Sequence, residues 1–163
     1  MENLEIRGVV REDIPALLEL LREFAEYEDL LHYLEVDAER LERAFFGDDA
    51  TVEGLIAREG ARAVGYAFFF PNFASFRGQR GFYLEDIYIR PAYRGRGIGQ
   101  AILRELARLA ASRGFERIDF VVLDWNTSAI GFYKQLGAEM DESERHFKFT
   151  DQNFKDLAGP KGS

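Results

Sequence analysis

Apolar positions along the chain follow two spacings, one typical of helices and one typical of strands. Between residues 14 and 25 they fall three or four residues apart, which is the buried stripe of an amphipathic helix. The same spacing returns between residues 98 and 110, and shorter apolar runs bounded by turn residues indicate strands. We therefore expect helices over 13–28, 37–47, 98–113 and 127–135, and strands over 4–9, 51–58, 63–70, 82–89, 118–123 and 145–150.

Polar and turn-forming residues mark the ends of these elements. Asp37 is expected to cap the second helix and Gly47 to end it, while Thr127 or Ser128 is expected to cap the last helix. The segment Pro71 to Gly81 is expected to be a loop. A strand, a long helix and another strand in succession form a β-α-β unit, whose two strands are parallel. The pattern as a whole predicts an α/β (α+β) fold.

The stretch from Phe82 to Gln100 joins a strand to a helix through a loop rich in glycine and arginine. A helix N-terminus carries unpaired N–H groups and a partial positive charge, and glycines let a phosphate approach the backbone. We therefore expect a phosphorylated ligand at this loop. Neither a P-loop nor the dinucleotide fingerprint fits, because no Gly-Lys-Ser/Thr follows and Gln100 stands where the third glycine of GxGxxG would be.

Length and composition limit the possibilities. A chain of 163 residues with 47% hydrophobic residues suits one domain, expected to span 1–163 with a small polar tail at 158–163. The chain has no cysteine and two histidines, so we expect no disulfide, no metal site and no acyl-cysteine intermediate. Because the chain has no cysteine nucleophile, any acyl transfer would occur directly between two bound substrates.

Charge and hydropathy also bear on location and partners. The net charge of −8 argues against a nucleic-acid partner and favours a small cationic substrate. No apolar run approaches the roughly 18 residues of a membrane-spanning helix, and the N-terminus lacks the apolar core of a signal peptide. We therefore expect a cytoplasmic protein with no membrane contact.

Several motifs together resemble one family. Arg94, Gly97 and Gly99 form R-x-x-G-x-G, which resembles the coenzyme A pyrophosphate signature of the GNAT superfamily of N-acetyltransferases. Further matches resemble its diamine acetyltransferase group, which includes spermidine/spermine and thialysine acetyltransferases. These matches are AEYE at 25–28, FYLED at 82–86 with YRGRGIG at 93–99, DWN at 124–126, FYK at 132–134 and LGA at 136–138.

The resemblance covers nearly the whole chain and implies the GNAT fold. That fold is a mixed, mostly antiparallel central sheet with a β-α-β acetyl-CoA-binding core flanked by helices. It implies acetyl-CoA as cosubstrate, with the pantetheine arm paired to strand backbone and the pyrophosphate held by the loop. The cofactor-binding residues implied in this way are Ile87, Tyr88, Ile89, Arg94, Gly95, Arg96, Gly97, Ile98, Gly99, Gln100, Asn126 and Tyr133.

Acetyl transfer to an amine also needs groups that handle protons, since an alkylammonium with a pKa of about 10.4 has no lone pair. Glu85 is the candidate general base, and the resemblance makes Tyr133 the general acid for the leaving thiolate. Asp86 points to the opposite face of the strand and is expected to be structural or to orient substrate. Tyr27 and Glu28 are implied to line the amine pocket.

Each of these residues also has a structural interpretation. Glu85 could cap loop amides, Tyr133 could be a core tyrosine, and Asn126 could be an ordinary helix cap. The sequence departs from the group at 139–146, where a tryptophan is expected, and this leaves the amine undetermined.

The expected activity is N-acetylation of a small polyamine, diamine or basic amino acid such as thialysine, lysine or ornithine, by a chain that forms a homodimer as the family often does. Two alternatives stay open at this point. One is a protein N-terminal or lysine acetyltransferase, and the other is a non-catalytic CoA-binding regulatory domain.

Overall fold

The computed structural model describes residues 3–160, which fall into two compact units divided after Val121. The strands of the first unit are β1 (Leu4–Gly8), β2 (Glu53–Glu59), β3 (Arg62–Ala74), β4 (Gln79–Ile89) and β5 (Arg117–Asp119). Its helices are α1 (Ile14–Tyr27), α2 (Ala38–Phe46) and α3 (Ile98–Ser112). The second unit contains α4 (Thr127–Gln135) and α5 (Asp151–Leu157).

The five strands form one sheet in the order β1-β2-β3-β4-β5. All neighbouring pairs are antiparallel except β4 and β5, which are parallel as the β-α-β pattern predicts. On β4 the register skips Glu85, because Phe68 pairs with Asp86 while Phe69 pairs with Leu84. Glu85 is therefore the extra residue of a β-bulge, a feature that re-aims side chains within a strand.

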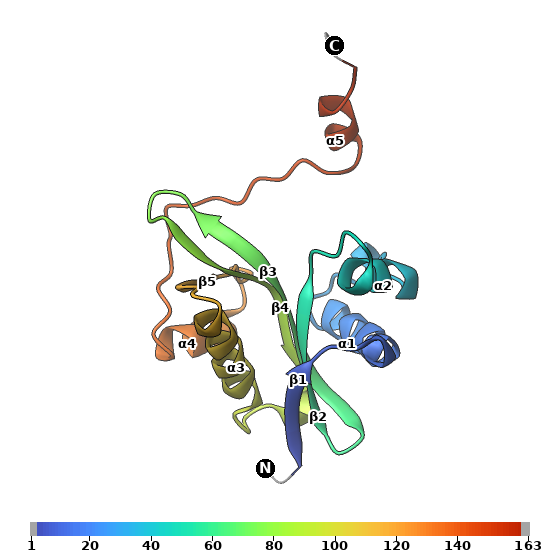
Figure 1. Ribbon diagram of the computed structural model, residues 1–163, viewed down its shortest axis with the longest axis vertical. Helices are drawn as coiled ribbons and strands as arrows, with labels where there is room; N and C mark the ends of the chain where they lie inside the picture. Colours follow the sequence, from blue (N-terminus) through green and yellow to red (C-terminus); the bar gives the residue numbers. More distant parts are fainter. Residues whose placement is uncertain (1–2, 161–163) are drawn as a thin grey trace. The chain divides into compact units, whose positions relative to one another are not determined.

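Helices cover both faces of this sheet (Figure 1). The helix α3 packs on one face through Ile98, Ile102 and Leu106, against a core that includes Phe82 and Leu84. The helices α1 and α2 pack on the other face, over a separate core. The members of this second core are Ile14, Leu17, Leu20, Leu41, Ile56, Ala63, Tyr66, Phe68 and Tyr88.

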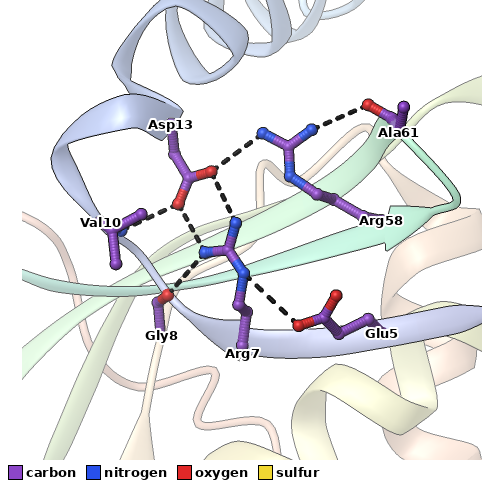
Figure 2. A network of polar contacts seen from close by, with 7 residues as sticks. All are labelled: Glu5, Arg7, Gly8, Val10, Asp13, Arg58 and Ala61. Carbon is purple, nitrogen blue, oxygen red and sulfur yellow. Dashed lines mark hydrogen bonds and ion pairs between the residues drawn. The ribbon is translucent and has the colours of Figure 1, made fainter.

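A buried carboxylate joins β1, β2 and the start of α1 (Figure 2). Asp13 is 1% exposed, and its two oxygens accept hydrogen bonds from Arg7 at 2.7 and 2.9 Å and from Arg58 at 2.9 Å. The backbone N–H of Val10 donates a further bond of 2.8 Å. Two guanidinium groups and an amide thus compensate the burial of this charge, as a buried carboxylate requires.

Several expected helix ends are confirmed. Asp37 caps α2 by accepting a 2.8 Å bond from the N–H of Arg40, and Gly47 follows the last residue of that helix. The helix α1 ends in a Schellman motif, in which Asp29 has a φ of +56° and the N–H of Leu30 bonds to the carbonyl of Ala25 at 2.7 Å. This motif fixes the position of the last residues of α1, Tyr27 and Glu28.

Three expectations about strands are wrong. Of the loop expected over residues 71–81 only a turn at 75–78 exists, since β3 continues to Ala74 and β4 begins at Gln79. The expected strand 118–123 is much shorter, because the β4–β5 ladder ends at the pair Tyr83 and Asp119, two residues before the bulge. Residues 145–150 form no strand, because no neighbouring strand pairs with them anywhere in the described chain, and α5 follows instead.

Candidate active site

The glycine-arginine loop lies between β4 and α3 and has the geometry of an anion site. Gly95 and Gly97 have φ values of +77° and +81°, and a Cβ built on either would have no described atom within 4 Å other than those of adjoining backbone and chain neighbours. Gly97 precedes α3, and in the described chain no side chain caps this helix start. The first N–H groups of a 15-residue helix therefore face an open, side-chain-free approach, which suits a diphosphate.

The side chain of Arg94 extends from this loop toward the end of α1. Its Nε donates a 2.9 Å hydrogen bond to the carbonyl of Ile89. Its guanidinium lies 4.5 Å from the ring centre of Tyr27 and 5.5 Å from that of Tyr88. Arg94 therefore joins the loop, the end of β4 and the end of α1, a position that the sequence analysis did not foresee.

Arg96 takes a different course from the same loop. It lies 3.5 Å from a carboxylate oxygen of Glu59 and 5.0 Å from the ring centre of Tyr93. Its side chain is 47% exposed, so its ion pair is weak and it can turn to an incoming phosphate.

The end of β4 offers backbone groups beside this loop. The partner strand β5 pairs with β4 only over Gly81 to Tyr83, whereas β3 pairs with β4 as far as Ile89. From Leu84 to Ile89, β4 thus has a strand on one side only among the described residues. Such an edge can pair with an extended chain, which is what the expected pantetheine contacts at Ile87, Tyr88 and Ile89 require.

The two adjacent carboxylates of β4 have different surroundings. Glu85 is exposed at the bulge, whereas Asp86 is partly buried on the face covered by α1 and α2. The Tyr66 hydroxyl donates a 3.3 Å hydrogen bond to Asp86. Burial and the charges of Glu85 and Glu28 raise the pKa of Asp86 to about 7, although the Tyr66 hydrogen bond acts in the opposite direction.

Glu28 reaches the same neighbourhood from the end of α1. It is partly buried, and burial raises the pKa of its carboxyl above the usual value. Its charge also contributes to the raised pKa of Asp86 and, with that of Asp86, to the raised pKa of Tyr66. We call Glu28, Glu85 and Asp86 the acidic cluster. Its charges repel one another, so a cation that binds among them is stabilised.

Tyr66 is a site residue that the sequence analysis missed. It is fully buried in the middle of β3 and lies opposite Tyr88 in the register. The signal was a hydroxyl inside an otherwise apolar run, since a buried tyrosine hydroxyl needs a hydrogen-bond partner.

The remaining candidates belong to the second unit. Tyr133 is partly buried in α4, and burial raises its pKa to about 12, which keeps the hydroxyl protonated at neutral pH. Asn126 caps α4 by accepting a 3.3 Å bond from the N–H of Ala129, so the expected caps Thr127 and Ser128 are wrong. The side-chain amide nitrogen of Asn126 can still donate to a ligand.

The described residues contain neither a metal-binding cluster nor a membrane-spanning helix. Across residues 3–160 no group of three or more His, Cys, Asp or Glu side chains is arranged to hold a metal ion. Within the same part of the chain, no helix has both the length and the apolar character needed to cross a membrane.

Comparison with known proteins identifies the family. The family model for the acetyltransferase (GNAT) family matches residues 14–138. A thialysine N-epsilon-acetyltransferase of Mus musculus is 35% identical, with 98% of this chain and 99% of that protein covered. A spermidine/spermine N(1)-acetyltransferase-like protein 1 of Homo sapiens is 32% identical, covering 97% of this chain and 24% of that protein. An integron cassette protein from the mobile metagenome of V. cholerae has the same fold, with a TM-score of 0.82, 22% identity and coverage of 98% and 100%.

Proposed function

Because this chain belongs to the GNAT acetyltransferase family, we propose that it transfers the acetyl group of acetyl-CoA to a primary amine of a small polycationic substrate. The observation that carries the proposal is the bridge made by Arg94. It connects the glycine loop, which suits a diphosphate, to Tyr27, whose chain neighbour Glu28 belongs to the acidic cluster. The side chain of Arg94 thus lies between a site suited to an anionic acyl donor and a site suited to a cationic amine acceptor.

Acetyl-CoA fits the residues at the loop. Residues 95–100 would hold the pyrophosphate through backbone N–H groups, with Arg96 as an added charge. The free edge of β4 at Ile87 to Ile89 would pair with the pantetheine arm, and Asn126 would donate to it. When bound, acetyl-CoA supplies the activated acyl carbon, and the chain supplies position, charge and proton transfer.

The acidic cluster favours a substrate with two or more positive charges. The similar mouse protein is named for thialysine and the similar human protein for spermidine and spermine, and both names denote amines of this kind. Tyr27, Glu28 and Asp86 would contact the amine, while the charge of exposed Glu85 would attract it.

Transfer would be direct, with both substrates bound together. Tyr133, protonated at neutral pH, would give its proton to the departing thiolate. The variant Tyr133→Phe is expected to lower kcat far more than it raises KM for acetyl-CoA, and an unchanged kcat would remove Tyr133 from the mechanism.

Thiol release from acetyl-CoA tests the activity. The amines are spermidine, spermine, putrescine, ornithine, lysine and thialysine, with a lysine-containing peptide as the comparison. The chain has no cysteine, so it adds no background to a thiol reagent. Turnover of one or more small amines above the peptide is expected. Faster turnover of the peptide would favour the protein acetyltransferase, and tight acetyl-CoA binding without turnover would favour the regulatory domain.

A pair of glycine variants tests the loop. Gly97 and Gly78 both have positive φ values, +81° and +62°, and open surroundings. Alanine at either position carries a similar backbone strain of about 1 kcal/mol. Only Gly97→Ala is expected to weaken acetyl-CoA binding, measured by calorimetry, and equal affinities in both variants would contradict the loop's role.

Homodimer formation and a cytoplasmic location stay part of the proposal. The segment 145–150 exposes Phe147 and Phe149, at 88% and 64%, beside backbone that pairs with no strand in the described chain. Such a segment can be covered by a second copy. Light scattering at several concentrations tests this, and a monomer throughout would contradict it.

A further inference from the structure

The two carboxylates of β4 are neighbours in sequence but cannot do the same chemistry. Glu85 is exposed, so water solvates its charge. Asp86 lies on the face that also carries the rings of Tyr66 and Tyr88, which are 0% and 4% exposed. A base that must take a proton from a bound ammonium works best where its own charge is poorly solvated.

The position of Asp86 is fixed by its neighbours. In the β3–β4 ladder Tyr66 lies opposite Tyr88, and Phe68 lies opposite Asp86, so Tyr66 and Asp86 are diagonal neighbours on one face. The Tyr66 ring is held 4.5 Å from that of Phe68 and 6.5 Å from that of Tyr88. Its hydroxyl, donating to Asp86 at 3.3 Å, therefore aims at the carboxylate from a rigid support.

We propose, on the basis of the function proposed above, that Asp86 accepts the proton of the substrate ammonium and that Tyr66 is the residue that positions it. The Tyr66 hydroxyl needs a hydrogen-bond acceptor, but this need does not by itself explain why the acceptor is a charged carboxylate. A neutral acceptor would satisfy the hydroxyl without a partly buried negative charge, which is unfavourable where no cation compensates it.

The charges around Asp86 come from every element packed near it. Glu85 is on its own strand, Glu28 is at the end of α1, and Tyr66 is on β3. Arg94 and Glu23 both contact Tyr88 on the same face. The net effect is a carboxylate with a pKa of about 7, which is half deprotonated at neutral pH.

The proton balance follows from this assignment. The ammonium gives one proton to Asp86, and the freed nitrogen attacks the thioester carbon. The C–N bond forms, the C–S bond breaks, and the thiolate takes a proton from the proposed general acid. The second proton of the nitrogen restores that acid, and Asp86 returns its proton to water. The products are an acetylated amine, a free thiol and one proton.

The pH dependence of kcat/KM for the amine tests the proposal, because it reports the ionisation of the free enzyme. In the wild type it should rise with pH through about 7. The isosteric variant Asp86→Asn should lose this rise and at least about 100-fold of kcat/KM. Exposed Glu39→Gln on α2 is the control for a simple change in net charge, and should leave the rise in place.

Two further variants should move the rise in opposite directions. Tyr66→Phe removes a hydrogen bond that favours the charged carboxylate, so the rise should move to higher pH. Glu85→Gln removes a charge that disfavours it, so the rise should move to lower pH. Since Glu85 is exposed, its variant folds even if Tyr66→Phe does not.

Other results would overturn the inference. If Glu85→Gln abolished the rise while Asp86→Asn retained it, the base would be Glu85. If Tyr66→Phe lowered kcat/KM equally at every pH, Tyr66 would be structural only. A wild type that acetylates no amine would overturn the proposed function itself, which is a different and recognisable failure.

Discussion

Asp13 and Asp86 are both shielded from water in the same sheet unit, yet their surroundings act on them in opposite directions. Asp13 accepts hydrogen bonds from Arg7, Arg58 and the amide of Val10, and these hold its pKa well below the usual range despite its burial. For Asp86, burial and the charges of Glu85 and Glu28 raise the pKa to about 7, and only the hydrogen bond from Tyr66 opposes this rise. Burial alone therefore does not distinguish a carboxylate with a structural role from one that can exchange a proton near neutral pH.

The difference shows which of the two carboxylates stabilises the fold and which one is suited to proton transfer. The Asp13 network joins two strands and a helix with its charge fully compensated. Asp86 lies in the acidic cluster, where no cation among the described residues pairs with it and where the proposed substrate would supply one. Functional sites often lower the stability of the folded protein when no ligand is bound.

The largest expected effect is the loss of Asp13. The variant Asp13→Asn leaves Arg7 and Arg58 without their anion, and it should lower the free energy of unfolding by about 3 kcal/mol. Urea denaturation at pH 7 measures this. The folded fraction should keep its amine acetylation, and a loss smaller than about 1 kcal/mol would contradict the structural role.

The pH dependence of the same variant follows from the direction of its pKa. The folded pKa of Asp13 is lowered, so its stabilisation is present above the unfolded pKa of 3.8 and is lost as pH falls below it. The variant should therefore approach the wild type in stability toward acidic pH.

The second effect has the opposite sign. The pKa of Asp86 is raised from 3.8 to about 7, so the folded state binds its proton more tightly and stability falls as pH rises across that window. Asp86→Asn should therefore be more stable than the wild type at pH 8 by about 2 kcal/mol, and equal to it near pH 4. Greater stability together with lost activity would support the contrast with Asp13. Lower stability at pH 8 would mean that Asp86, like Asp13, stabilises the fold.

A smaller loss of stability is expected from replacing Arg58, one of the two arginines that bind Asp13. Arg58→Met removes one of the two cations from Asp13, and the free energy of unfolding should fall by about 1 to 2 kcal/mol. Arg62→Met, at an exposed site four residues on, is the matched control and should change stability by less than about 0.5 kcal/mol. Equal effects of the two variants would mean that Arg58 acts only as a surface residue.

The smallest effect concerns Glu28. Its charge is the lesser of the two that raise the pKa of Asp86, so Glu28→Gln should lower that pKa less than Glu85→Gln does. The amine KM should rise several-fold at the same time, because Glu28 would contact the substrate. The ratio of the two pKa changes, taken from pH–rate profiles, checks the order, and a larger shift in Glu28→Gln would reverse it.

Sequence patterns predicted those features that depend on local chemistry. The stripes of α1 and α3 and the cap at Asp37 follow from spacing and from one side chain. The continuation of β3 through Pro71 was missed because proline usually ends a ladder. Here the β2 ladder stops at Phe69, so Pro71 has no β2 partner that would need its missing N–H.

The candidate site shows the same limit. Glycine spacing pointed to the loop, strand alternation put Glu85 and Asp86 on opposite faces, and the family resemblance pointed to Tyr27 and Glu28 as residues of the amine pocket. The Tyr66–Asp86 contact depends on the pairing of β3 with β4, in which Tyr66 lies opposite Tyr88 and Phe68 opposite Asp86. The turn of Arg94 toward Tyr27 depends on the end of α1. Neither the register of two strands nor a contact between distant segments can be predicted from a local sequence pattern.

The most direct test is a titration of the aspartate side-chain carboxyl carbons by NMR in the free protein. The resonance of Asp86 should titrate near pH 7, while that of Asp13 should stay in its ionised position down to acidic pH. An Asp86 that titrates near 3.8, the ordinary value for an aspartate, would contradict the account, because the two carboxylates would then differ only in what they touch.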